Sequence, residues 1–155
     1  MSEIDGGCGM IETIYGRDGR HSTPYLTRIF LLKTRWGRLQ FHIFHRGDED
    51  PDPHDHPWDF WTLPLTSYIE EVRSTDGSIT KRLVAAGRVH FRPAEFTHRL
   101  LCRAAWAGGK IYSLVWVKCP RRKWGFYTSR GWVPWREYVF DRPDEPARPP
   151  GGDAA

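Results

Sequence analysis

The stretch that decides the fold reads Gly87-Arg88-Val89-His90-Phe91-Arg92-Pro93-Ala94-Glu95-Phe96-Thr97-His98. It predicts a strand, a tight turn at the proline and a returning strand that starts at a histidine. Upstream, His54 and His56 stand one residue apart, and alternate residues of an extended strand point to the same face. Three neutral imidazoles that converge on one face of a β-structure can bind a first-row divalent metal ion. The sequence therefore predicts a metal site made by His54, His56 and His98.

The rest of the chain reads as short β-segments, separated at regular intervals by clusters of Gly, Pro and Asp. The predicted strands span residues 25–34, 38–45, 58–67, 68–73, 78–84, 88–91, 98–103 and 110–118. Asp76-Gly77 is a strong signal for a hairpin turn, and the aromatic stretch over residues 124–140 predicts another strand or a cap. So many short strands in 155 residues are typical of a β-sandwich or a small barrel.

The length of 155 residues suits one domain with a single core. We expect that domain over residues 13–140, after a flexible segment at residues 1–12 and before a disordered Pro/Gly-rich tail at residues 141–155. The three cysteines are an odd number at no metal-like spacing, which fits a reducing compartment. Neither a secretory signal nor an apolar run of membrane-spanning length is found. We therefore expect a soluble, cytoplasmic protein without a membrane partner.

The charge balance is mildly basic, with a formal net charge of +4. The only dense basic cluster is Arg121-Arg122-Lys123, which is followed by aromatic residues. Such a mixture can bind phosphates and stack on bases. On so short a run, a solvated loop is the preferred interpretation, and nucleic acid is not the expected partner.

The stretch that ends at His98 resembles the second motif of the cupin superfamily, Gly-x5-Pro-x-Gly-x2-His-x3-Asn. Gly87, Pro93 and His98 occupy its first Gly, its Pro and its His, whereas Glu95 stands at the family's second Gly and Cys102 at its Asn. The resemblance implies an all-β fold, the cupin jelly roll or double-stranded β-helix barrel. It also implies His98 as a metal ligand, and an edge-strand homodimer by analogy.

The first cupin motif, Gly-x5-His-x-His followed by a Glu, matches in part. His54 and His56 are in place, but Gly47 lies one residue too early and Phe60 or Trp61 stands where the family has its glutamate ligand. The His-Asp-His-Pro-Trp string also resembles a set of small cupins of unassigned function. Those proteins end in Trp-Gly-Phe and Gly-Trp-x-x-Trp-Arg-Glu stretches, and this chain has both.

The missing glutamate leaves the ligand set open. Three imidazoles alone give a neutral set with free positions for water, O2 or substrate, as in some cupin thiol dioxygenases. Alternatively Asp59 completes the set, if a bulge at Pro57 shifts the strand phase by one residue. Glu95 is expected to bind backbone amides or to orient an imidazole, and Asp55 is expected to face away from the site.

Two arginines are candidates for binding a charged group of the substrate. If Arg28 or Arg92 enters the barrel, its planar fork would suit a carboxylate or phosphate group. The preferred interpretation places both on the barrel exterior. A small-molecule substrate is expected, with an anionic one among the alternatives.

The leading functional hypothesis is a mononuclear non-haem Fe(II) dioxygenase that acts on a small organic substrate, with Zn, Mn or Ni as alternative metals. The alternatives are a metal-dependent isomerase or lyase, in which a tyrosine or histidine moves the proton, and a non-catalytic small-molecule-binding cupin. An enzyme is preferred over a binding module. The sequence assigns no catalytic residue and no site for an organic cofactor.

Overall fold

The structure is a computed structural model that describes residues 10–15, 24–103 and 109–140. The predicted C-terminal tail at residues 141–155 and most of the predicted N-terminal segment, residues 1–9, lie outside the described residues. The predicted boundary at residue 12 falls inside a strand, because Ile11–Ile14 forms β1 and pairs with β2. No helix of the described residues is long and apolar enough to cross a membrane.

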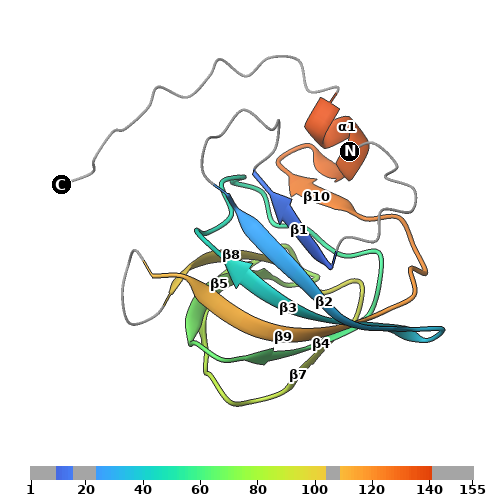
Figure 1. The fold of residues 1–155 in the computed structure, drawn as a ribbon. Coiled ribbons are helices and arrows are strands. Elements are labelled where there is room, and N and C mark those ends of the chain that lie inside the picture. Colours follow the sequence, from blue (N-terminus) through green and yellow to red (C-terminus); the bar gives the residue numbers. More distant parts are fainter. Residues whose placement is uncertain (1–9, 16–23, 104–108, 141–155) are drawn as a thin grey trace.

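The described chain is almost entirely β-structure, as predicted (Figure 1). Its strands are β1 (Ile11–Ile14), β2 (Leu26–Thr34), β3 (Gly37–Phe44), β4 (Phe60–Pro64), β5 (Tyr68–Arg73), β6 (Ile79–Val84), β7 (His90–Arg92), β8 (Thr97–Arg103), β9 (Ile111–Lys118), β10 (Gly125–Thr128) and β11 (Gly131–Pro134). A short helix, α1 (Trp135–Phe140), follows β11. The aromatic stretch at residues 124–140 therefore forms both a hairpin and a helical cap.

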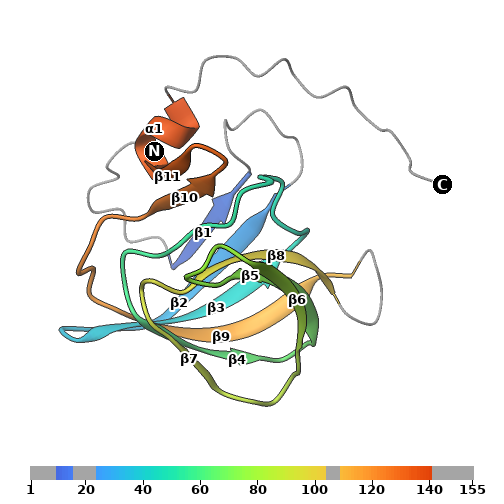
Figure 2. The same cartoon turned by 180° about the vertical axis from the view of Figure 1, so that it is seen from behind.

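Two antiparallel sheets face each other and enclose the interior (Figures 1 and 2). The larger sheet has the strand order β1-β2-β3-β9-β4-β7, and the smaller one has the order β6-β5-β8. β10 and β11 form a separate hairpin, against which α1 packs. The architecture is the predicted cupin jelly roll. The chain passes from one sheet to the other between consecutive strands. For example, β4 pairs with β9 and β7 in the larger sheet, whereas β5 pairs with β6 and β8 in the smaller one.

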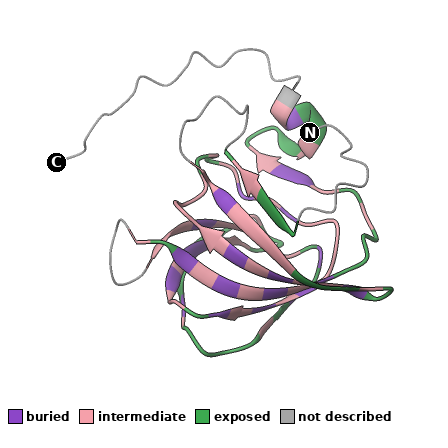
Figure 3. Ribbon diagram, in the orientation of Figure 1, coloured by how far each residue is buried: buried purple, intermediate pink, exposed green. Residues whose placement is uncertain are grey.

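Side chains alternate between the interior and the outer surface along the central strands. In β9 every second residue from Ile111 to Val117 is buried, and Figure 3 shows this as alternating bands. Such a period of two is what one inward face and one outward face of a strand require. The inward face of β9 is not wholly apolar, because Ser113 is buried between Ile111 and Val115.

Two apolar clusters lie in the interior. In the first, Ile111 and Phe44 of the larger sheet pack with Tyr68, Val84 and Leu100 of the smaller one. The second consists of Phe60, Val115 and Val117, against which Trp58 packs. Members of both clusters also line a cavity between the sheets.

The predicted hairpin turn at Asp76-Gly77 joins β5 to β6. Gly77 has a φ of +88°, a conformation that L side chains rarely adopt. Asp76 Oδ1 accepts hydrogen bonds from the Ser78 backbone N–H at 2.9 Å and from the Ser78 hydroxyl at 2.7 Å. The turn fixes the β5–β6 register, which places Arg82 directly opposite Glu70.

Candidate metal centre

The three predicted histidines come together, although two of them do not lie on a regular strand. His54 and His56 belong to an extended segment between β3 and β4. The backbones of His54 and His98 exchange two N–H···O hydrogen bonds of 3.0 Å each, and the His56 N–H donates to Ala94 O at 2.9 Å. Residues 54–56 lie outside the predicted strands and form no regular strand, yet these bridges hold the segment in place, so both imidazoles reach His98.

The nitrogens of this group are close enough to share one ion. One ring nitrogen from each of His54, His56 and His98 lies within 4.8 Å of the others. The His56 and His98 Nε2 atoms are 3.0 Å apart. Two nitrogens at adjacent corners of an octahedron, each about 2.1 Å from the metal, would be separated by about 3.0 Å. The observed spacing fits that arrangement.

His98 is oriented by a buried carboxylate from the neighbouring strand. Its Nδ1 lies 2.8 Å from Glu70 Oε2, across the β5–β8 pair. Burial alone would raise the pKa of Glu70, but its hydrogen bonds with His98 and Arg92 and the charge of Arg92 outweigh burial and hold that pKa well below its usual range. The ionised Glu70 must accept, so the His98 Nδ1–H donates and the Nε2 lone pair is left facing His56. Carboxylates hold metal-ligating imidazoles in this way.

The imidazoles of His56 and His98 are held neutral. Burial is the largest cause that lowers the pKa of His98, and the nearby Glu70 opposes it only in part. Burial is also the largest cause that lowers the pKa of His56. A neutral imidazole is the form that ligates a metal, so the donor set fits a divalent ion before any ion is bound.

Glu70 itself belongs to an ionic network that ties the two sheets together. It is fully buried and accepts from Arg92 Nη1 at 2.8 Å, from Arg92 Nη2 at 3.1 Å and from Arg82 Nε at 2.8 Å. Arg92 lies on β7 of the larger sheet and is only 1% exposed. The expectation that Arg92 lies on the exterior was wrong, because this buried carboxylate compensates its charge.

The sequence analysis missed Glu70, although a signal was present. Glu70 shares strand parity with Tyr68, which faces the interior, and Arg92 occupies the inward position of its own strand. An acidic and a basic residue that both face inward on facing sheets indicate a buried pair. Only the fold shows that this pair also reaches His98.

Asp59 and Glu95 do not join the three histidines. Both carboxylates bind Arg121, at 2.7 Å from Asp59 Oδ1 and at 2.7 Å from Glu95 Oε2. Asp59 also accepts from the Ala94 N–H at 2.9 Å. The hydrogen bonds from Arg121 are the largest cause of the lowered pKa of each carboxyl. The alternative that gave Asp59 a ligand role is therefore replaced by a surface ion pair.

Asp55 points away from the imidazoles, as expected, and its carboxylate binds the C-terminal segment of the chain. It is fully buried and accepts from the Gly125 N–H at 2.7 Å, from Arg122 Nη1 at 2.6 Å and from Trp132 Nε1 at 3.1 Å. Asp55 thus attaches the β10–β11 hairpin to the histidine segment. Together with the Arg121 pairs, this bond engages two of the three cations of the basic cluster in the protein's own structure.

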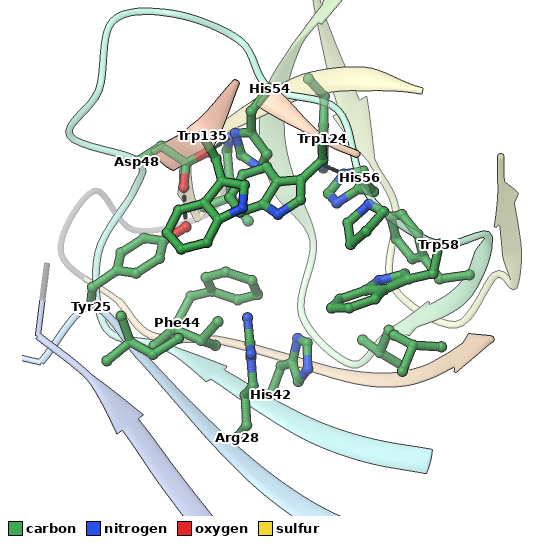
Figure 4. A pocket seen from close by; sticks show the side chains of 18 of the residues that line it. Tyr25, Arg28, His42, Phe44, Asp48, His54, His56, Trp58, Trp124 and Trp135 are labelled. Atoms are coloured by element: carbon green, nitrogen blue, oxygen red, sulfur yellow. Dashed lines mark hydrogen bonds between the residues drawn. The ribbon is translucent and has the colours of Figure 1, made fainter. Parts of the chain in front are cut away.

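The histidine group lies in the wall of a cavity of about 1240 Å³ inside the barrel (Figure 4). Apolar lining residues include Phe60, Val115, Val117, Trp58, Trp124 and Trp135. Trp124 and Trp135 stack with ring centroids 5.7 Å apart, and the Trp124 ring contacts His54 edge-on. Two tryptophans of the stretch that was predicted to form a strand or a cap therefore lie beside the candidate site.

Arg28 also lines this cavity and enters the barrel rather than remaining on its exterior. In Figure 4 its side chain rises from β2, beside His42, toward the interior. The expectation of an exterior Arg28 was wrong for the same reason as for Arg92: alternation turns both side chains inward. Unlike Arg92, Arg28 has a single weak carboxylate contact within the described part of the chain, with Glu12 at 3.4 Å.

The fold is shared with solved structures of other proteins. A cupin-2 domain from Rhodospirillum rubrum aligns with a TM-score of 0.54 and 18% identity, over 78% of each chain. A "putative mannose-6-phosphate isomerase" from Ralstonia eutropha JMP134 aligns with a TM-score of 0.50 and 20% identity, over 64% of this chain and 89% of that one. Fe(II) HppE aligns with a TM-score of 0.52 and 11% identity, over 69% of this chain.

The likeness concerns the fold. The chain spans about half of HppE, since the alignment covers 56% of that chain. No protein-family model matches the sequence, and no curated protein does. The candidate site has to be interpreted from its own residues.

Proposed function

Because the chain has the cupin fold, we propose that it is a metal-binding cupin in which His54, His56 and His98 hold one divalent ion, and that it acts as a mononuclear non-haem Fe(II) dioxygenase on a small organic substrate. The observation that carries the proposal is the spacing of the three imidazoles, with His98 oriented by the buried Glu70. Fe(II), when bound, would supply redox chemistry toward O2. Zn, Mn and Ni are the alternative metals.

The residues around the histidines support a reaction carried out away from bulk water. The apolar walls and the stacked pair of Trp124 and Trp135 surround the space in front of the three imidazoles. A substrate in the cavity would be oriented by this wall and held beside the metal, which lowers the entropic cost of bringing reactants together. A cavity of about 1240 Å³ is large enough for a small organic molecule.

Two candidate proton carriers are poorly suited to the alternative of an isomerase or lyase. Burial raises the pKa of Tyr68 to about 12, and burial lowers the pKa of His42 to about 3. Near pH 7 the phenol therefore stays protonated, and the imidazole is too weak a base to remove a substrate proton efficiently. The likeness to Fe(II) HppE supports an Fe(II) enzyme at the level of the fold, and the likeness to an isomerase keeps the alternative open at the same level.

The proposed ligand is a small molecule rather than nucleic acid. Arg121 and Arg122 are engaged with carboxylates, which leaves Lys123 as the cation of the basic cluster without an ion pair among the described residues. One such lysine gives little affinity for phosphates.

Metal analysis combined with oxygen uptake tests the proposal. The full chain is purified without added metal, its metal content is measured, and O2 consumption is followed with pools of thiols, amino acids and aromatic acids. One equivalent of iron and substrate-triggered uptake are expected, and both should be lost in His56→Ala. Zinc or nickel without uptake would favour the isomerase or lyase. Ligand binding without turnover under every metal would leave the non-catalytic cupin.

A further inference from the structure

One wall of the cavity carries polar residues that the proposed metal site does not use. Arg28 of β2 stands opposite His42 of β3, and His42 stands opposite Ser113 of β9. All three line the cavity. Figure 4 shows Arg28 and His42 projecting into the cavity from the wall that faces His54 and His56. A ligand between the two walls could contact both groups.

The guanidinium of Arg28 has donors to spare. Within the described residues its one hydrogen bond joins Nη1 to Glu12 Oε2 at 3.4 Å, which is long. Its Nε is buried and has no hydrogen-bond partner. A guanidinium carries five N–H donors, and unsatisfied buried donors cost free energy. Burial is also the largest cause that lowers the pKa of Arg28, which fits a poorly solvated cation.

On the β3 side of Arg28 the facing residues His42 and Ser113 are neutral, whereas Glu12 stands opposite Arg28 on β1. The His42 imidazole stays uncharged and is fixed by a hydrogen bond between its Nε2 and Gln40 Oε1 of 2.8 Å. Among the carboxylates that line the cavity, Asp48 is engaged with the Tyr25 hydroxyl and with the Leu100 N–H at 2.7 Å. Among the described residues, the carboxylate that contacts the guanidinium is that of the exposed Glu12.

The other interior arginine is not available in the same way. Arg92 gives two hydrogen bonds to the buried Glu70 and one to the Tyr68 hydroxyl. Its charge is thus compensated within the protein. Of these two arginines, Arg28 is the one whose charge and terminal donors face a ligand space.

We propose that Arg28 binds the oxyanion group, a carboxylate or phosphonate, of a small organic ligand whose other end reaches the His54-His56-His98 group. A planar guanidinium pairs with two oxygens of such a group in parallel, and a poorly solvated site strengthens that pairing. Phe60, Val115 and Trp58 line the space for an apolar body of the ligand. The inference rests on the proposed function and assigns a substrate class to it.

A set of matched probes tests the assignment. Binding of hexanoate, hexylphosphonate and the neutral hexanamide is measured on the full chain by calorimetry, with and without Mn(II). At least one of the two anions should bind at least about tenfold more tightly than hexanamide, the effect of one charge-assisted hydrogen bond. The preference should persist without Mn(II), because a metal can itself bind a carboxylate. The two anions distinguish a carboxylate site from a phosphonate site.

Three variants separate Arg28 from the overall charge. Arg28→Gln should abolish the preference for the anion, whereas Arg88→Gln, which removes the same charge from an exposed residue outside the cavity lining, should keep it. Glu12→Gln should tighten binding of the anion, because it removes the competing carboxylate. This variant leaves Arg28 in place, so the test holds even if Arg28→Gln does not fold.

The inference is overturned if the wild-type protein binds hexanamide as tightly as both anions, or if it binds none of the probes. It is also overturned if the preference survives in Arg28→Gln or vanishes equally in Arg88→Gln. Metal content, measured on the same samples, reports on the proposed function separately. Protein that takes up no metal overturns that function, whereas metal-loaded protein that ignores the anions overturns only the role of Arg28.

Discussion

Two fully buried carboxylates lie next to the histidine group: Glu70 beside His98, and Asp55 between His54 and His56 in the chain. Each accepts several hydrogen bonds and each is paired with an arginine. One of the hydrogen bonds that Glu70 accepts comes from the Nδ1–H of His98. Asp55 instead accepts hydrogen bonds from the C-terminal segment, from Gly125, Arg122 and Trp132.

The difference lies in what each carboxylate orients. Glu70 fixes the side chain of a proposed ligand, so its loss should change the affinity for metal. Asp55 fixes the backbone path of the hairpin that covers the cavity, so its loss should change stability first. Equal burial of two acids therefore does not imply equal function, and metal affinity and unfolding free energy should separate them.

The largest effect is expected from removal of a ligand itself. His98→Ala should lower metal affinity by more than the roughly 10–100-fold typical of losing an outer partner of a ligand, because one of three donors is gone. Equilibrium dialysis with Fe(II) under anaerobic conditions measures it. The control is His45→Ala, since His45 bonds Thr27 and stands outside the group. Unchanged metal uptake in His98→Ala would end the proposed centre and, with it, the assigned role of Glu70.

The next effect is expected for Glu70→Gln. Metal affinity should fall by about 10–100-fold, because the amide no longer accepts the Nδ1–H of His98 as a charged partner. The unfolding free energy should also fall by about 3–5 kcal/mol, since Arg92 is left buried without its counter-ion. Dialysis on the folded fraction and urea unfolding give the two quantities. A variant that loses stability but keeps its metal affinity would reduce Glu70 to a structural acid like Asp55.

Asp55→Asn supplies the other half of the comparison. The amide oxygen can still accept from the Gly125 N–H, and Arg122 is partly exposed and can be rehydrated. We expect a loss of about 1–3 kcal/mol in unfolding free energy, with a smaller change in metal affinity than in Glu70→Gln. The same dialysis and urea experiments measure both. If the two variants lose metal equally, the distinction between the two acids fails.

The contrast between the two acids also shows which features of the site can be predicted from the sequence. Strand alternation and the Gly87–His98 motif predicted the barrel and the proximity of His54, His56 and His98, because those patterns are local. Asp55 could be placed facing away by parity alone. Parity can turn Glu70, Arg28 and Arg92 inward, but it cannot assign their partners, because these depend on which strands of the two sheets face each other across the interior. Only the three-dimensional register reveals a diagonal pair such as Glu70 and His98.

The smallest effect is expected at the exposed counterpart of these buried pairs, where Arg121 binds Asp59 and Glu95. Arg121 lowers the pKa of both carboxyls, so its pairs stabilise the fold above their ordinary pKa of about 4. That stabilisation is lost as the pH falls through the lowered folded-state values, where both acids become protonated. Arg121→Gln should therefore melt slightly below the wild type at pH 7.

The difference in melting temperature should close as the pH falls below about 4, and salt should narrow it at pH 7, since exposed pairs are screened. Thermal melts of metal-free protein across this range measure it. The control is Lys123→Gln, which removes a charge from the same loop without breaking an ion pair of the described residues. A difference that persists unchanged in strong acid would show that Arg121 acts through packing of its side chain. The smaller stability effect at Arg121 could then not be attributed to the exposure of its ion pairs.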